Sequence, residues 1–149
     1  MKKLILFSIL CISIIGFTSC SKDDGPSSSK GKTGKFTISA PGLSGEDLVL
    51  VMFTGSNGAQ LVKTPWKING VAQENQSNIR IENEHLADGK TIVVETATRL
   101  DNIIVTLGGT SDGTPFTLKF KAEINGKVEN DITEQVSGAT FSKQFTYAN

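Results

Sequence analysis

Few side chains of this chain could serve as a nucleophile, a general base or a metal ligand. Its 149 residues contain two cysteines, Cys11 and Cys20, and a single histidine, His85. A serine-type triad would need His85 as its base, yet the sequence has no Gly-x-Ser-x-Gly elbow to present the serine. A zinc site with one histidine would depend on carboxylates for most of its ligands, which is unusual for zinc. We interpret His85 as a surface loop residue and predict no catalytic residue and no metal site.

Acidic turns could bind calcium, because loop carboxylates and carbonyl groups suffice for this ion. The candidates are Glu46-Asp47, Asp101-Asn102 and Asp112, which could meet at one end of a β-sandwich. No EF-hand spacing accompanies them, and aspartate and asparagine in turns usually hydrogen-bond to the local backbone. We therefore favour a role in the turns over a calcium site.

A pair of carboxylates could also hydrolyse glycosides, and Glu95 and Glu123 are the candidates on predicted strands. Both positions are typical of a solvated sheet face. A sugar cleft is normally lined by several aromatic residues, whereas this chain has one tryptophan, Trp66, and one tyrosine, Tyr147. The sequence therefore favours a protein that is not an enzyme.

Trp66 and Tyr147 are the remaining candidates for contact with a ligand. Trp66 follows Pro65 and lies between Lys63 and Lys67, which places it near the start of a strand at the surface. A sandwich of this size commonly buries its single tryptophan, so core packing is one interpretation. The other is a partly exposed platform that stacks on a sugar or grips a protein. Both stay open, and we retain Trp66 and Tyr147 as candidate ligand-binding residues.

The first nineteen residues have the layout of a secretory signal peptide. Lys2 and Lys3 give a positive start, residues 4–17 form an apolar stretch, and Thr18 and Ser19 are short and polar. As a helix the apolar stretch would rise about 21 Å, against about 30 Å for the hydrocarbon core of a bilayer. It is therefore expected to direct export and to be removed.

Cys20 directly follows this segment, in the run Phe17-Thr18-Ser19-Cys20, which resembles the lipobox of bacterial lipoproteins. That family usually has leucine three residues before the cysteine and glycine or alanine just before it, where this chain has Phe17 and Ser19. The resemblance implies a diacylglycerol on the Cys20 sulfur and a further acyl chain, such as palmitate, on its amine. Because each buried methylene adds about 0.8 kcal/mol, two or three chains hold a protein on a membrane almost permanently. Cys20 is thus expected to be a lipid anchor.

Lys22, Asp23 and Asp24 come just after the anchor and resemble the acidic export signal of Bacteroidetes-type surface lipoproteins. This resemblance implies an outer-membrane protein exposed on the cell surface, with a periplasm-facing position as the alternative. The stretch Ser21 to Gly34 is rich in glycine, serine and lysine and has no apolar residue. Such a composition cannot join a core and predicts a flexible tether.

The expected organisation is a signal peptide at 1–19, a lipidated cysteine with its tether at 20–34, and a single domain at 35–149. After removal of Lys2 and Lys3 the chain has 13 basic against 15 acidic residues, and no basic patch stands out. The electrostatic footprint of a nucleic-acid-binding protein is therefore missing. Since Cys20 is the only cysteine left, the domain has no internal disulfide and must be stable through its core.

Strand patterns fill the domain. The clearest strand is Phe116–Ile124, where apolar and polar residues alternate strictly. Leu48–Phe53 is a continuous apolar run, which predicts a strand buried on both faces. Phe141–Tyr147 closes the domain as a last strand, but its pattern does not decide which face is inside. In all, about eight or nine strands result, with no convincing helix.

Turn residues set the expected connections. Asn125-Gly126 and Asp88-Gly89 are hairpin signals. A two-residue turn at the first would place Val128 on the wet face, whereas a three-residue loop that pairs Ile124 with Val128 suits the apolar pattern better; both registers stay open. The segment Gly108–Gly113 is glycine-rich, but no helix follows it, so it is not a phosphate-binding loop and we predict a mobile connection.

These features predict an all-β fold, an antiparallel β-sandwich with immunoglobulin-like or Greek-key connections, with a lipocalin-like closed barrel as the alternative. The expected function is that of a lipid-anchored, non-catalytic binding or interaction module at the outer membrane. Its partners would be the membrane, through the anchor, and a glycan or an envelope protein, with no cofactor and no nucleic acid. The alternatives are an accessory subunit of an envelope assembly and, less favoured, a barrel that carries a small apolar ligand.

Overall fold

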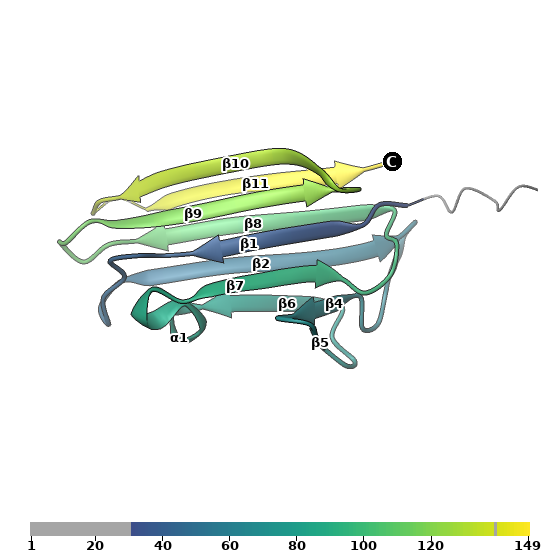
Figure 1. Ribbon diagram of the computed structural model, residues 1–149, viewed down its shortest axis with the longest axis horizontal. Helices are drawn as coiled ribbons and strands as arrows, with labels where there is room; N and C mark the ends of the chain where they lie inside the picture. The colour runs from purple at the N-terminus through teal and green to yellow at the C-terminus, as the bar shows by residue number, and fades with distance from the viewer. Residues whose placement is uncertain (1–30, 139) are drawn as a thin grey trace, which may run out of the picture.

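A computed structural model describes residues 31–138 and 140–149 and shows two antiparallel β-sheets packed face to face (Figure 1). Cys20 and the export-signal residues Lys22, Asp23 and Asp24 lie outside the described residues. So do the expected signal peptide and most of the expected tether. The described residues thus comprise the domain and residues 31–34 of the expected tether.

The six-stranded sheet has the order β10-β9-β1-β7-β4-β5. Its strands are β10 (Lys127–Val136), β9 (Phe116–Ile124), β1 (Gly34–Ser39), β7 (Thr91–Thr96), β4 (Trp66–Ile68) and β5 (Val71–Ala72). The five-stranded sheet has the order β11-β8-β2, with β3 and β6 both paired to the far side of β2. Its strands are β11 (Phe141–Ala148), β8 (Asn102–Thr110), β2 (Leu48–Asn57), β3 (Gln60–Leu61) and β6 (Asn78–Glu82).

The fold is therefore the expected β-sandwich, and the closed barrel is excluded. In the described part of the chain the two sheets end separately, at β10 and β11, which lie side by side in Figure 1 without pairing. The chain changes sheets repeatedly, for example from β1 to β2 and from β7 to β8 to β9. Inward-facing side chains from both sheets form one core, since apolar and polar residues alternate along the strands.

Strand β2 differs from its expected environment, because it is buried on one face only. Val49, Val51 and Phe53 point inward and are at most 4% exposed, whereas Leu48 and Leu50 are 68% and 39% exposed on the outer face. The prediction of burial on both faces was wrong, because no element described in the structure covers the outer face of the five-stranded sheet. Two leucines are thereby left in contact with solvent.

The Asn125-Gly126 turn has two residues, so Ile124 pairs with Lys127 and Val128 lies on the wet face. Both turn residues have positive φ, at 50° and 77°, as a type I′ turn requires. A β-bulge at Glu129 then shifts the register, so that Ile132 pairs with Phe120 and faces inward. Of the two registers left open, the two-residue turn is the one found, and the bulge explains why the apolar pattern suited a three-residue loop better.

Two other connections also differ from expectation. Asp88-Gly89 is not a hairpin, because the strands on either side, β6 and β7, belong to different sheets. A single helical turn, α1 (Asn83–Leu86), and a 3₁₀ turn (Ala87–Gly89) make this crossover instead. Gly108 and Gly109 are part of strand β8, so only the second half of the glycine-rich segment is a loop.

The last strand, β11, has a charged residue on its inward face, which explains why its sequence pattern did not decide which face is inside. Phe141, Lys143, Phe145 and Tyr147 face the core, and Lys143 forms an ion pair with Glu134 of β10 across the gap between the sheets. A charge that points inward at a sheet edge discourages pairing with another chain. The apolar pattern of β11 is broken because one of its inner positions carries this lysine.

The domain begins earlier than expected. Lys32 pairs with Leu100 through two backbone hydrogen bonds of 2.7 and 2.9 Å, and Arg99 donates to the carbonyl of Gly31. Residues 31–34, expected in the tether, are therefore bonded to the sandwich. None of the helices in residues 31–138 and 140–149 has the length and apolar character needed to span a bilayer.

The register at the bulge gives a first prediction. Deletion of Glu129 leaves every other pair of the β9–β10 hairpin in place, so the free energy of unfolding should change by less than about 1 kcal/mol. Deletion of Thr133 forces part of β10 to turn over, for example exposing Ile132, and should cost about 2–5 kcal/mol. Urea unfolding of both variants measures the difference. Equal losses of unfolding free energy would show that Glu129 is not the extra residue of the bulge.

Candidate functional site

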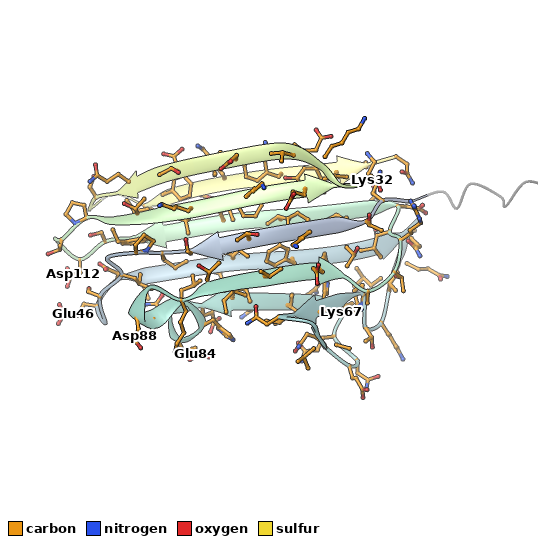
Figure 2. The ribbon with its side chains drawn as sticks, in the orientation of Figure 1. Lys32, Glu46, Lys67, Glu84, Asp88 and Asp112 are labelled. Carbon is orange, nitrogen blue, oxygen red and sulfur yellow. The ribbon has the colours of Figure 1, made fainter. Side chains whose placement is uncertain are left out.

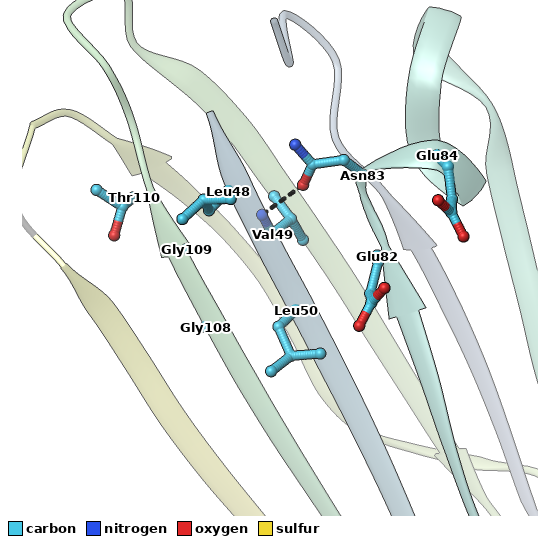
Figure 3. A pocket seen from close by; sticks show the side chains of 9 residues that line it. All are labelled: Leu48, Val49, Leu50, Glu82, Asn83, Glu84, Gly108, Gly109 and Thr110. Carbon is cyan, nitrogen blue, oxygen red and sulfur yellow. Dashed lines mark hydrogen bonds between the residues drawn. The ribbon is translucent and has the colours of Figure 1, made fainter. Parts of the chain in front are cut away.

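A groove of about 590 Å³ lies on the outer face of the five-stranded sheet (Figure 3). Strands β2 and β8 form its floor, and the end of β6 with the start of α1 forms one wall. Its lining consists of Leu48, Val49, Leu50, Glu82, Asn83, Glu84, Gly108, Gly109 and Thr110. The groove combines exposed leucine side chains with a carboxylate rim, and apolar pockets with a few polar groups are typical of ligand and partner sites.

Two adjacent glycines in the floor have different reasons to be glycine. A Cβ on Gly109 would come within 3.3 Å of the Phe116 ring in the core, so the ring would have to shift by a few tenths of an ångström to admit it. A Cβ on Gly108 would meet nothing closer than 3.7 Å, and the backbone of Gly108 is not left-handed. Gly108 is opposite Leu50 on the outer face, so the missing side chain leaves bare backbone beside that leucine. A glycine inside a strand often marks a place where another molecule approaches closely.

Asn83 forms part of the wall of the groove, where its side-chain amide hydrogen-bonds to β2 in place of a neighbouring strand. Its Oδ1 accepts the Val49 N–H at 2.7 Å, and its Nδ2 donates to the carbonyl of Asp47. These backbone groups lie beyond the last β2–β6 pair, Leu50 with Glu82, and the amide takes the place of a paired strand. Buried backbone groups must be paired, so Asn83 fixes the start of β2 and with it Leu48.

Carboxylates line the groove on the side of α1. Glu82 and Glu84 line it, and Glu84 also lines an adjoining hollow of about 290 Å³ together with Asp88 and residues 43–45. Figure 2 places Glu46, Glu84, Asp88 and Asp112 at this end of the sandwich, whereas Lys32 and Lys67 lie toward the other end. The groove therefore opens at an acidic end of the domain.

Asp47 ties the loops of this end together. Its Oδ2 accepts the Ser44 N–H at 2.7 Å, and its Oδ1 accepts the Asp112 N–H at 2.9 Å. The Ser44 backbone hydrogen bond lowers the pKa of the Asp47 carboxyl below its usual 3.8; burial opposes this shift, and the bond from Asp112 reinforces it. The side chain is only 1% exposed, so it is a structural clamp and not a ligand.

The two candidate ligand-binding residues are elsewhere. Trp66 is fully buried, packs 5.5 Å from the Phe53 ring and donates from Nε1 to the Ser77 carbonyl at 3.0 Å. This is the core interpretation, and the ring offers no platform to a sugar. Tyr147 is 9% exposed and donates to Asn130 Oδ1 at 2.6 Å; burial raises the pKa of its hydroxyl to about 12, with a contribution from Glu129. Neither residue lines the groove.

The other sequence candidates are brought together only in part. Asp47 and Asp112 meet, but Asp101 lies at the other end, where it accepts the Gly58 N–H at 2.9 Å. No group of three or more metal-ligating side chains occurs in the described part of the chain. His85 is half-buried on α1, and its Nδ1 accepts the Glu82 N–H at 3.1 Å.

The groove residues were not predicted from the sequence. Leu48 and Leu50 looked like core, and Gly108 looked like a loop. No alternation within β2 separates the two exposed leucines from Val49, Val51 and Phe53, because residues 48–53 are all apolar.

Comparisons with known proteins bear on the fold. No protein-family model and no curated protein matches this chain. Among solved structures, a DUF4425 family protein from Bacteroides ovatus is 15% identical with a TM-score of 0.55, over 78% of this chain and 94% of its own. A calcium-bound protein from Parabacteroides distasonis is 18% identical with a TM-score of 0.57, over 78% and 93%. A domain of unknown function, DUF4425, from Bacteroides vulgatus is 14% identical with a TM-score of 0.53, over 79% and 94%. These likenesses show a shared sandwich fold.

The Asp47 clamp gives a pH-dependent prediction. Because its folded pKa lies below the unfolded value, Asp47 contributes stability that is present above about pH 4 and is lost as the pH falls through the folded pKa. Asp47→Asn should destabilise the domain by about 1–3 kcal/mol at neutral pH and lose less further stability on acidification than the unchanged chain. Urea unfolding between about pH 7 and pH 3 measures this slope. Glu46→Gln, at an exposed neighbouring position, is the control; the same slope in Asp47→Asn as in the unchanged chain would contradict the clamp.

Proposed function

We propose that this chain is a lipid-anchored, non-catalytic binding module of the cell envelope, and that it binds its partner in the groove over Leu48, Leu50 and Gly108. The observation that carries the proposal is the exposure of these two leucines beside a glycine that the fold does not need. Exposed apolar area that is concave and rimmed by polar groups is typical of interaction sites. The anchor part of the proposal rests on Cys20 and the residues around it.

The position of the groove suits a tethered protein. Strand β1 begins at one end of the sandwich, and the groove lies at the other, near the starts of β2 and α1 (Figure 1). A lipid on Cys20 would attach the domain to the membrane at the end near Lys32, since residues 31–34 are bonded there. The groove would then lie at the end farther from the attachment point (Figure 1), where a partner can reach it.

A protein partner suits the groove better than a glycan does. Sugar sites rely on aromatic platforms, and neither Trp66 nor Tyr147 lines the groove. Calcium has no part in the proposal, although one protein of the same fold was solved in a calcium-bound form. In this chain both carboxylate oxygens of Asp47 accept backbone N–H groups.

The anchor is tested by location. With Cys20→Ser, the chain should move from the membrane fraction of its cells to the soluble fraction, because no thioether can form. Intact mass spectrometry of the unchanged protein should show the added acyl chains. An unacylated protein, or Cys20→Ser protein that stays in the membrane fraction, would contradict the anchor.

The groove is tested by photo-crosslinking in cells. A photoreactive residue in place of Leu48 should give a discrete adduct, and one in place of Lys119, exposed on β9 of the other sheet, should not. Gly108→Val in the same chain should abolish the adduct by filling the floor, while Thr106→Val, one row along β8, should leave it. An adduct that survives Gly108→Val, or no adduct at Leu48, would refute the groove as the binding site.

A further inference from the structure

We infer that the groove receives an extended polypeptide segment whose alternate side chains are apolar and whose flanking residues are lysine or arginine. This inference rests on the proposed function and names the chemistry of the partner. It is carried by the spacing of the apolar groups, the bare strand backbone between them and the charges of the rim.

The apolar groups have the spacing of an extended chain. Leu48 and Leu50 are two residues apart on one strand, so they project from the same face about 6.8 Å from each other. Alternate side chains of an extended segment lying over β2 have the same separation. Two small apolar side chains of such a segment can therefore contact both leucines at once.

The floor allows close approach. Gly108 is level with Leu50, and a side chain there would rise into the groove and not into the protein. Because Gly108 has no side chain, a segment can lie directly against the sheet and bury apolar area. A bulky residue at this position would keep the segment away from the sheet. Figure 3 shows Gly108 beside Leu50, with Glu82 on the opposite side of that leucine.

The charges select a cationic partner. Glu82 and Glu84 line the groove, and neither takes part in any of the ion pairs found among residues 31–138 and 140–149. Asp88 adds negative charge next to Glu84, although Lys90 lies 4.0 Å from its Oδ2. Arg80 is the basic residue closest in register; it is opposite Met52, one row along the sheet, and does not line the groove. Carboxylates without a cationic partner beside apolar side chains complement a lysine or arginine and repel an acidic segment.

The probe is a pair of peptides, acetyl-Lys-Thr-Val-Thr-Val-Thr-Lys-amide and its counterpart with glutamate at both ends. Both place their two valines on one face of an extended chain, with the terminal charges on the same face. The protein is the chain from residue 20 to 149 with Cys20→Ser, which contains every residue that the structure describes. Titration followed by NMR chemical shifts gives both the affinity and the contact surface.

The lysine peptide should shift the amides of the groove, and the glutamate peptide should bind more weakly by at least about fivefold. Raising the salt from about 0.05 M to about 0.5 M should weaken the lysine peptide. Gly108→Val should weaken it about tenfold, and the matched Thr106→Val should leave it unchanged. Glu82→Gln with Glu84→Gln should bring the two peptides to similar affinities.

Equal affinity of the two peptides, shifts outside the groove, or no binding of the lysine peptide would overturn the inference. None of these results decides the proposed function, which the crosslinking experiment tests. If Leu48 gives an adduct but the lysine peptide does not bind, the groove binds a partner of other chemistry. If Leu48 gives no adduct, both the proposed function and this inference are wrong.

Discussion

The structure depends on the packing of Phe36 between the two sheets. Its ring lies 5.1 Å from the Phe53 ring on the opposite sheet, 6.1 Å from Phe120 and 6.0 Å from Tyr147. A side chain on Gly34 would collide with the Phe36 ring at 2.6 Å, which explains a glycine at the start of β1. In a domain whose sequence contains no cysteine, contacts of this kind must supply the stability that a disulfide would otherwise add.

Because the inward apolar positions are committed to this core, the outer faces are free to differ. The six-stranded sheet carries alternating charges on its outer face, such as Lys35 between Glu95 and Glu123. The five-stranded sheet instead carries Leu48 and Leu50 beside Gly108, at some cost in solubility. The core requires none of these three residues, and the proposed binding role accounts for side chains that folding leaves unexplained.

Strand content, the sandwich architecture and the Phe116–Ile124 strand were predictable from alternation, because a strict period of two has one structural solution. Errors arose where a local pattern depends on distant neighbours. Whether Leu48 and Leu50 are covered depends on what lies over β2, and no pattern within β2 reveals that. The bulge at Glu129 and the inward Lys143 likewise make sense only beside Phe120, on the neighbouring strand of the same sheet, and Glu134, on the edge strand of the opposite sheet. The groove could not be assembled from the sequence for the same reason.

If the groove is a binding site, a partner covers the outer face of β2 in the cell. Hydroxyl-radical footprinting of intact cells and of the purified chain measures this directly, and Leu61 and Val71, 56% and 65% exposed elsewhere on the surface, are internal references. Leu48 and Leu50 should be oxidised in the purified chain and protected on cells, with Leu61 and Val71 oxidised equally in both. Equal oxidation of Leu48 and Leu50 in the two samples would contradict a covered groove.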